Sequence, residues 1–312
     1  MFSFFKNACV YSLRRPDVID LEKLNEQLAA YAFTPCASSD MARTGWRPIT
    51  DGGDKYFHAA GGYALLVVRN EKKIIPAEAI NTKLMAKVDQ LEQSQGRKLK
   101  KAEKDSLKEE ILHTLIPRAF VRSSFTQIWI DLKTNRIVVD TASAKRAENA
   151  LALLRKSVGS LPVMPVCCEN PAEVVLTEWL KQQGAPSPFI LEDITSAKVE
   201  SILETGASAT FRKEPVGSEP LETSVADGRV VTSLEVSFEN SFRTKVALTH
   251  DFTIKKITYS DIFIEANDDI ACEEEENQAL VRKEADFILM CDELAALITS
   301  MLIAFGGEVA TA

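Results

Sequence analysis

The sequence predicts an α+β fold, in which strands and helices occupy separate blocks of a 312-residue chain. Three observations predict this class. Short apolar runs bounded by turn residues gather in residues 1–75 and 118–166, whereas residues 76–117 have the apolar spacing of helices. Further strand-like runs over residues 189–265 precede a strongly apolar helix near the end of the chain. We therefore expect mixed or antiparallel sheets, packed helices and one projecting helical hairpin.

A central domain is predicted to combine residues 1–75 with residues 118–166. Asp20 and Ser143 are expected helix N-caps, because their side chains accept hydrogen bonds from free amides in the first turn. The expected elements are strands at Phe4–Leu13, Tyr63–Arg69, Gln127–Leu132, Arg136–Thr141 and Leu161–Val166, and helices at Asp20–Tyr31 and Ser143–Val158. Prolines in the last of these strands predict that it lies at a sheet edge.

Residues 76–117 are predicted to form the hairpin as a tip domain. Pro76 opens its first helix at a position where the missing N–H is not needed. One apolar stripe runs from Ile80 to Leu91 and a second from Leu107 to Leu115, before Pro117. The break between the stripes places the run 97–104 near the bend.

Residues 167–312 are predicted to form an acidic α+β base domain. Residues 273–276 are expected to be a solvated acidic patch. A helix near Glu284–Phe305 is strongly apolar and is expected to be buried or to form a subunit interface, with Leu294, Leu297 and Ile298 in that packing. The other expected elements are a helix at Asn170–Gln183 and strands at Phe189–Leu191, Val230–Phe238, Thr244–Thr249 and Ile254–Tyr259.

The charge of the chain is divided between its halves. Residues 1–165 carry a net charge of +8, whereas residues 166–312 carry −16. The densest basic run holds Arg97, Lys98, Lys100, Lys101 and Lys104 with a single acid, Glu103. Clustered cations bind polyanions because neutralised phosphates release their condensed counterions. Nucleic acid is therefore the first partner that the sequence suggests, although such a run is also compatible with a solvated helix face.

The residues that follow the hairpin extend this candidate surface. Arg118 and Arg122 come directly after the second helix, and the hairpin is expected to bring them close to the basic run. Phe120 lies between them. It is expected either to plug the core under the hairpin or to be an exposed anchor at a protein contact, where aromatic residues contribute much of the binding energy.

Motifs for most kinds of catalysis are absent from the sequence. It contains no P-loop, dinucleotide fingerprint, nucleophile elbow or zinc-protease motif. Its six cysteines form no C-x-x-C pair and its three histidines are scattered, so we expect reduced thiols, no metal site and no cofactor. No signal peptide is evident, and no apolar run approaches the roughly 20 residues of a membrane helix, so a cytoplasmic protein without a membrane partner is expected.

Two alternatives remain open on the residues alone. Asp131, Lys133 and Asp140 lie on adjacent predicted strands, and two carboxylates with a lysine can hold a divalent metal and polarise a phosphate in a nuclease. These residues are equally typical of a polar hairpin end. The second alternative is a protein-interaction scaffold, in which the basic run is only a solvated face.

Several segments resemble the RdgC family of recombination-associated proteins of proteobacteria, in the family's order and nearly from end to end. The similar segments are Ala32–Cys36, Arg97–Lys101, Asp105–Lys108, Leu115–Phe120, Ala142–Lys145, Leu151–Ser157, Gly159–Val163, Ala285–Met290 and Glu293–Ile298. Several long segments in one order are more specific than any single motif.

The resemblance implies a non-catalytic, nucleoid-associated homodimer, closed head to head into a ring around double-stranded DNA. Binding without sequence preference and restraint of RecA recombinase are implied with it. By position, the resemblance implies that the five cations of residues 97–104 and Arg118 contact DNA. It also implies that Phe120 contributes to ring closure at the hairpin tips and that Lys213 lies at the other ring contact.

Overall fold

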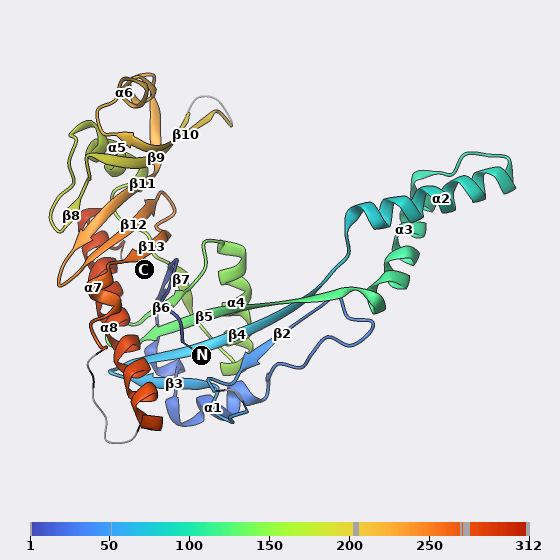
Figure 1. Ribbon diagram of the computed structural model, residues 1–312, viewed down its shortest axis with the longest axis horizontal. Helices are drawn as coiled ribbons and strands as arrows, with labels where there is room; N and C mark the ends of the chain where they lie inside the picture. Colours follow the sequence, from blue (N-terminus) through green and yellow to red (C-terminus); the bar gives the residue numbers. More distant parts are fainter. Residues whose placement is uncertain (1, 51, 202–205, 269, 271–274, 310–312) are drawn as a thin grey trace.

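A seven-stranded antiparallel sheet forms the first half of the chain (Figure 1). The structure is a computed structural model and describes residues 2–50, 52–201, 206–268, 270 and 275–309. The sheet order is β2-β4-β5-β6-β1-β7, with β3 also paired to β4. The strands are β1 (Cys9–Leu13), β2 (Ala42–Arg47), β3 (Phe57–Ala60), β4 (Tyr63–Ile74), β5 (Phe120–Asp131), β6 (Arg136–Val139) and β7 (Val163–Pro165). Strand β7 lies at the edge, as predicted.

The first sheet separates two apolar cores. Alternate residues of β5 face opposite sides of the sheet, so Ile128 and Ile130 join one core while Trp129 joins the other. The first core is closed by α1 (Leu21–Ala29) and α4 (Ala144–Val158), and a short 3-10 turn, η1 (Pro16–Val18), precedes α1. Asp20 and Ser143 cap these helices by accepting from the amides of Glu22 and Arg146. Both predicted N-caps are confirmed.

The first predicted strand was too long, because the chain changes sheets within it. Residues 6–8 pair with the second half of the protein: the Ala8 amide donates to Ile254 O at 2.8 Å, and the Ile257 amide donates to Lys6 O at 2.9 Å. Only Cys9–Leu13 joins the first sheet. The preceding phenylalanines Phe2 and Phe4 pack against aromatic residues of the second half instead of continuing a strand.

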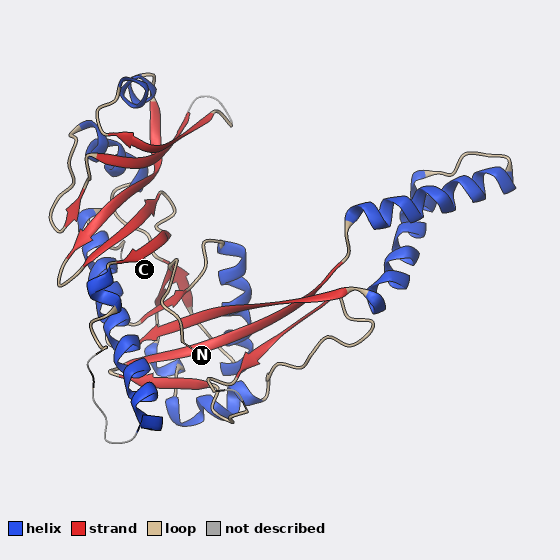
Figure 2. Cartoon of the chain, viewed as in Figure 1, coloured by secondary structure: helices blue, strands red, loops and turns tan. Residues whose placement is uncertain are grey.

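The hairpin leaves the sheet at its far end (Figure 2). Helix α2 (Ala77–Gln95) begins after Pro76 and ends at Gly96, whose φ of 64° is the left-handed conformation that glycine adopts without strain. Helix α3 (Lys101–Leu115) and the 3-10 turn η2 (Ile116–Arg118) return to β5. The structure describes all of residues 76–117, and their buried apolar side chains are those of Val88, Leu99, Ile111 and Ile116. Such a small core indicates low local stability.

A six-stranded antiparallel sheet forms much of the second half. Its order is β10-β9-β11-β12-β13, with β8 paired to β11. The strands are β8 (Phe189–Ile190), β9 (Ile194–Ser201), β10 (Ser208–Pro215), β11 (Arg229–Glu239), β12 (Arg243–Thr249) and β13 (Ile254–Tyr259). Helices α5 (Ala172–Lys181) and α6 (Glu219–Ala226) contact β11, and α7 (Asp261–Ile264) follows β13.

Strands β9 and β10 were absent from the sequence prediction. The inward residues of β9 are Thr195, Ala197 and Val199, of which two are small or polar, so the apolar alternation is weak. Strand β10 is an exposed edge strand and has little apolar pattern to detect.

The predicted acidic patch at residues 273–276 and Cys272 fall largely outside the described part of the chain. The five described cysteines are free thiols.

Helix α8 (Glu275–Ala304) contributes a continuous row of side chains to the second core. Two roles were predicted for Leu294, Leu297 and Ile298, core packing and a subunit interface. All three are at most 1% exposed, so they belong to the core. The expectation that no apolar run has membrane length was wrong: by length and composition the segment Leu280–Ala304 is sufficient, although half of its most apolar window is buried inside this chain. Its apolar face is therefore occupied by the protein's own core.

Helix α8 also carries a buried carboxyl group. The Glu293 side chain is almost fully buried and accepts a hydrogen bond from Thr244 Oγ1 at 3.0 Å. Burial raises the pKa of Glu293 above its ordinary value, because the charged form loses hydration. The folded state therefore favours the protonated form, and this contribution to stability is present below the unfolded pKa and is lost as pH rises through the folded pKa.

Replacing Glu293 by Gln is expected to stabilise the protein at neutral pH. The free energy of unfolding should then lose the part of its pH dependence that comes from Glu293, which lowers stability as pH rises. Glutamine keeps an acceptor for Thr244 and has no charge to desolvate. The expected gain is about 1.4 kcal/mol for each unit by which the native pKa exceeds the unfolded one. Denaturant unfolding at pH 5 and pH 8 measures it; an equal effect of the substitution at both pH values would contradict the interpretation.

Candidate nucleic-acid interface

The bend between α2 and α3 displays the predicted basic run. The left-handed Gly96 ends α2, and the chain crosses to α3 through residues 97–100. Leu99 is the one buried residue of this crossing, at 8% exposed, and it anchors the bend on the hairpin core. Arg97, Lys98 and Lys100 flank it and are exposed. The alternation of one apolar anchor with cations directs the positive charge outward.

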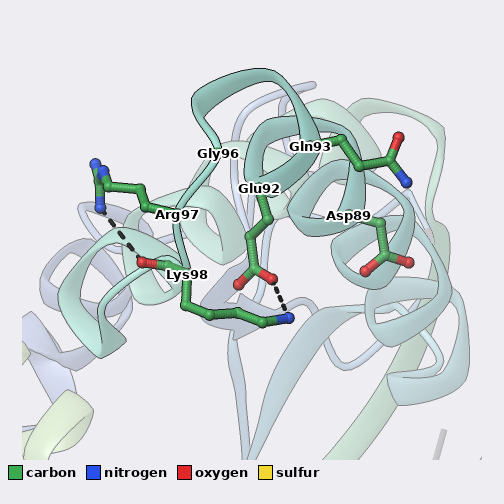
Figure 3. Close-up of a pocket in the computed structure, with 6 residues that line it drawn as sticks. All are labelled: Asp89, Glu92, Gln93, Gly96, Arg97 and Lys98. Atoms are coloured by element: carbon green, nitrogen blue, oxygen red, sulfur yellow. Dashed lines mark hydrogen bonds and ion pairs between the residues drawn. The ribbon is translucent and has the colours of Figure 1, made fainter.

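Two carboxylates pair with part of this run. The Glu103 carboxylate accepts hydrogen bonds from both terminal nitrogens of Arg97, at 2.9 and 2.6 Å. Its Oε2 atom also accepts a hydrogen bond from the Lys100 amide at 2.7 Å. Glu92 accepts from Lys98 Nζ at 2.7 Å and lies 3.4 Å from Lys104 Nζ. A shallow pocket of about 330 Å³ beside the bend shows how Glu92 reaches Lys98 (Figure 3). Its lining mixes both charge signs.

The ion pairs hold both glutamates in their charged form. The hydrogen bond from Lys98, followed by that from the Leu99 amide, lowers the pKa of Glu92 to about 2. The hydrogen bond from Arg97, followed by that from the Lys100 amide, lowers the pKa of Glu103 to about 2. Throughout the physiological pH range, these two negative charges therefore offset two of the five positive charges of the run, through contacts with Arg97, Lys98 and Lys104.

Lys100 and Lys101 are the cations of the run that stay open to an external anion. Both are exposed, and neither has an ion pair within the residues that the structure describes. The side chain of Lys98 is also 91% exposed despite its pairing with Glu92. A phosphate group could contact Lys100 and Lys101 without first displacing a carboxylate of the chain.

The remaining predicted residues lie at the other end of α3. Arg118 ends η2 and Arg122 lies in the outer part of β5, beyond a fifteen-residue helix that spans about 22 Å. The expectation that the hairpin brings them close to the basic run was therefore wrong. The cause is the direction of α3, which carries the chain from the bend back to the sheet (Figure 1).

Phe120 and Lys213 occupy two separate exposed positions. Phe120 starts β5 at the root of the hairpin and is 87% exposed, so it does not plug the core. Lys213 lies on the edge strand β10, where the pairing register shifts between Phe211 and Glu214. Its φ of 52° and the donation from its amide to Ser196 Oγ define this bulge.

The structure does not assemble the alternative nuclease residues. Asp131 caps its own turn by accepting from the amides of Lys133 and Thr134, at 2.8 and 3.1 Å. Asp140 accepts from the amides of Lys6 and Asn7. The strand register places Asp140 opposite Gln127, four residues from Asp131, which corresponds to about 13 Å.

That separation is far larger than carboxylates sharing one metal centre require. Lys133 does not approach Asp140 either: its Nζ lies over the Tyr63 ring and 3.6 Å from Asp292. Across the described residues, no group of three or more His, Cys, Asp or Glu side chains is arranged to hold a metal ion.

Sequence reasoning missed a second cationic site, a groove of about 440 Å³ between the outer parts of β4 and β5 and the start of α4. Its charged lining residues are Lys72, Arg122, Lys145 and Arg146. Only Arg122 had been singled out. The signal in the sequence was the pair Lys145-Arg146 in the first turn after the N-cap Ser143, where helices usually carry acidic residues.

Comparison with known proteins finds matches over nearly the whole chain. A family model described as "Putative exonuclease, RdgC" matches residues 3–308. Recombination-associated proteins RdgC from Yersinia enterocolitica and Serratia proteamaculans are each 44% identical over 306 residues, covering 98% of both chains. The protein of the same name from Edwardsiella ictaluri is 44% identical over 308 residues, which is 98% of this chain and 99% of that one.

These matches span both sheets, the hairpin and the last helix, so the likeness covers nearly the whole chain and not one part of it. The resemblance inferred from separate segments is confirmed. The chain belongs to the RdgC family of recombination-associated proteins.

Proposed function

We propose that this protein is a non-catalytic, sequence-independent binder of double-stranded DNA that acts in the bacterial nucleoid and restrains RecA-mediated recombination. Two copies would close into a ring around the duplex, with Phe120 at the contact between hairpins and Lys213 at the contact between the acidic base domains. In this proposal residues 1–75 with 118–166, residues 76–117 and residues 167–312 act as its centre, tip and base.

The observation that carries the proposal is the exposed basic bend. Lys100 and Lys101 face solvent at the start of α3, without an acidic partner in the described chain, and they belong to the hairpin that projects from the first sheet (Figure 1). Lysine contacts phosphates as a flexible point charge, which positions a protein on DNA without reading bases. The recombination-associated relatives supply the cellular context. Arg97, Lys98, Lys104, Arg118 and Arg122 are proposed as further phosphate contacts.

The exposure of Phe120 supports a self-contact at the hairpin. A phenylalanine that is 87% exposed at the root of a projecting element is a strong candidate for an anchor at a protein interface. The neighbouring Val121 and Phe125 are 47% and 48% exposed, and the alternation of the strand turns them to the opposite face of β5 from Phe120. A symmetric contact between two copies would cover the same residues on both.

A nuclease is the second candidate, because the description of the matching family model names an exonuclease. The sequence offers Asp131, Lys133 and Asp140 for this role, but the strand register separates their carboxylates and each already caps backbone amides. The geometry of these residues does not favour a nuclease site, and we therefore prefer DNA binding without cleavage.

Replacing Lys100 and Lys101 by Glu is expected to reduce duplex affinity by at least tenfold at moderate salt and to flatten its salt dependence. Each lost phosphate contact lowers the slope of log K against log salt by about 0.9. Fluorescence anisotropy with a labelled duplex measures both quantities. The variant Lys83→Glu/Lys108→Glu changes the same charge elsewhere on the hairpin and is the control. Equal losses in both variants would argue against a specific contact at the bend.

Replacing Glu92 and Glu103 by Gln is expected to have the opposite effect and to strengthen duplex binding. Glutamine keeps an oxygen for the Leu99 and Lys100 amides but releases Arg97 and Lys98 from their charged partners. The same anisotropy titration should show higher affinity and a steeper salt slope. A variant that bound more weakly, while circular dichroism showed its helices intact, would mean that the ion pairs orient the cations for DNA.

Ring closure is tested with a covalently closed DNA circle. Protein mass in solution should correspond to a dimer, and the dimer should stay on the circle in moderate salt but slide off after the DNA is linearised. The Phe120→Ala variant should leave circular DNA as quickly as it leaves linear DNA, because the contact that closes the protein ring is weakened. Equal release of the wild type from both forms would exclude encirclement.

Degradation of the linear DNA in magnesium, abolished by Asp131→Asn, would support the nuclease.

A further inference from the structure

The groove beside α4 concentrates positive charge that the fold itself does not balance. Lys72 and Arg122 lie directly opposite each other on β4 and β5, and like charges at such cross-strand positions repel. Both side chains are exposed and line the groove. Neither has an ion pair within the described residues, and no acidic residue lines this groove.

The third and fourth cations oppose a helix dipole. Lys145 and Arg146 lie in the first turn of α4, which contains no acidic residue. The amino end of a helix carries partial positive charge, so cations there are unfavourable and anions are favourable. Both residues are exposed, and their side chains have no hydrogen bond or ion pair in the described chain. Two independent local conflicts therefore meet at one groove.

A threonine without a side-chain hydrogen bond lines the same groove. Thr126 is only 7% exposed and lines the groove, and its hydroxyl has no hydrogen-bond partner among the described residues. An anion or water in the groove would give this hydroxyl a hydrogen-bond partner. The side chains of Asn70 and Ser124 add polar groups to the same lining.

We propose that this groove binds a backbone phosphate of nucleic acid as a second anchor, separate from the hairpin bend. A phosphodiester would relieve the repulsion between Lys72 and Arg122, complement the amino end of α4 and accept from the Thr126 hydroxyl. Local conflicts that an external ligand resolves are typical of functional sites. The inference rests on the proposed function, because it supplies that DNA-binding protein with a contact on the central sheet.

The test uses the full-length double variant Lys145→Ala/Arg146→Ala. Alanine preserves α4 because it is a good helix former and the Ser143 cap bonds the backbone of residue 146. Duplex affinity should fall, and the slope of log K against log salt should decrease by about 2, because two phosphate contacts are lost. The control Lys156→Ala/Lys181→Ala removes two cations from the last turns of α4 and α5 and should leave the slope unchanged.

A second measurement does not depend on DNA. In buffer without phosphate, the groove variant should melt at a higher temperature than the wild type, because the unfavourable cations are gone. Inorganic phosphate at constant ionic strength should raise the melting temperature of the wild type and of the control more than that of the groove variant. Equal phosphate responses in all three proteins would overturn the groove as an anion site.

The outcomes separate this inference from the proposed function. If the wild type binds duplex, Lys100→Glu/Lys101→Glu abolishes binding and the groove variant keeps the wild-type slope, the groove is not a DNA contact and the proposed function stands. If the wild type binds no duplex at any salt, the proposed function fails and the groove fails with it as a nucleic-acid site.

Discussion

The pairing of β4 with β5 along twelve residues is the constraint on which the rest of the molecule depends. Continuous register from Tyr63 opposite Asp131 to Ile74 opposite Phe120 keeps one ladder intact from the buried core to the root of the hairpin. The inner half is held by apolar packing on both faces. In the outer half β5 is largely exposed, whereas β4 is held by its pairing with β2 and by the buried side chains of Glu71 and Lys73. This extension sets the position of the basic bend, of Phe120 and of the groove beside α4.

The inner half of the same ladder joins the two halves of the chain. One face packs on α1 and α4, and the other packs through Tyr63, Leu65 and Trp129 into the core that contains α8. The Tyr63 hydroxyl donates to Asp292 at 2.5 Å, and residues 6–8 pair with the second sheet. Residues 167–312 are therefore packed directly against the first sheet, and that sheet carries the hairpin.

Electrostatics at the hairpin depends on local pairing more than on net charge. The basic run contains five cations, yet Glu92 and Glu103 engage three of them and hold their own carboxyls ionised. Within the basic run, Lys100 and Lys101 have no ion pair among the described residues, and the groove on the central sheet adds four more cations. An arrangement of this kind weakens indiscriminate attraction to polyanions while leaving defined contact points, which suits the reversible backbone binding that we propose.

The sequence by itself determined the α+β class, the hairpin boundaries at Pro76 and Pro117, both helix caps, the edge strand and the family, because these depend on residue spacing and local hydrogen bonding. It did not reveal β9 and β10, whose apolar alternation is weak, or the change of sheet after Ala8. It also misplaced Arg118 and Arg122 relative to the bend and assigned no binding role to Lys72, Lys145 and Arg146. Only the tertiary structure decided these points, because strand register and helix direction bring residues far apart in sequence together, and local patterns carry no information about that distance.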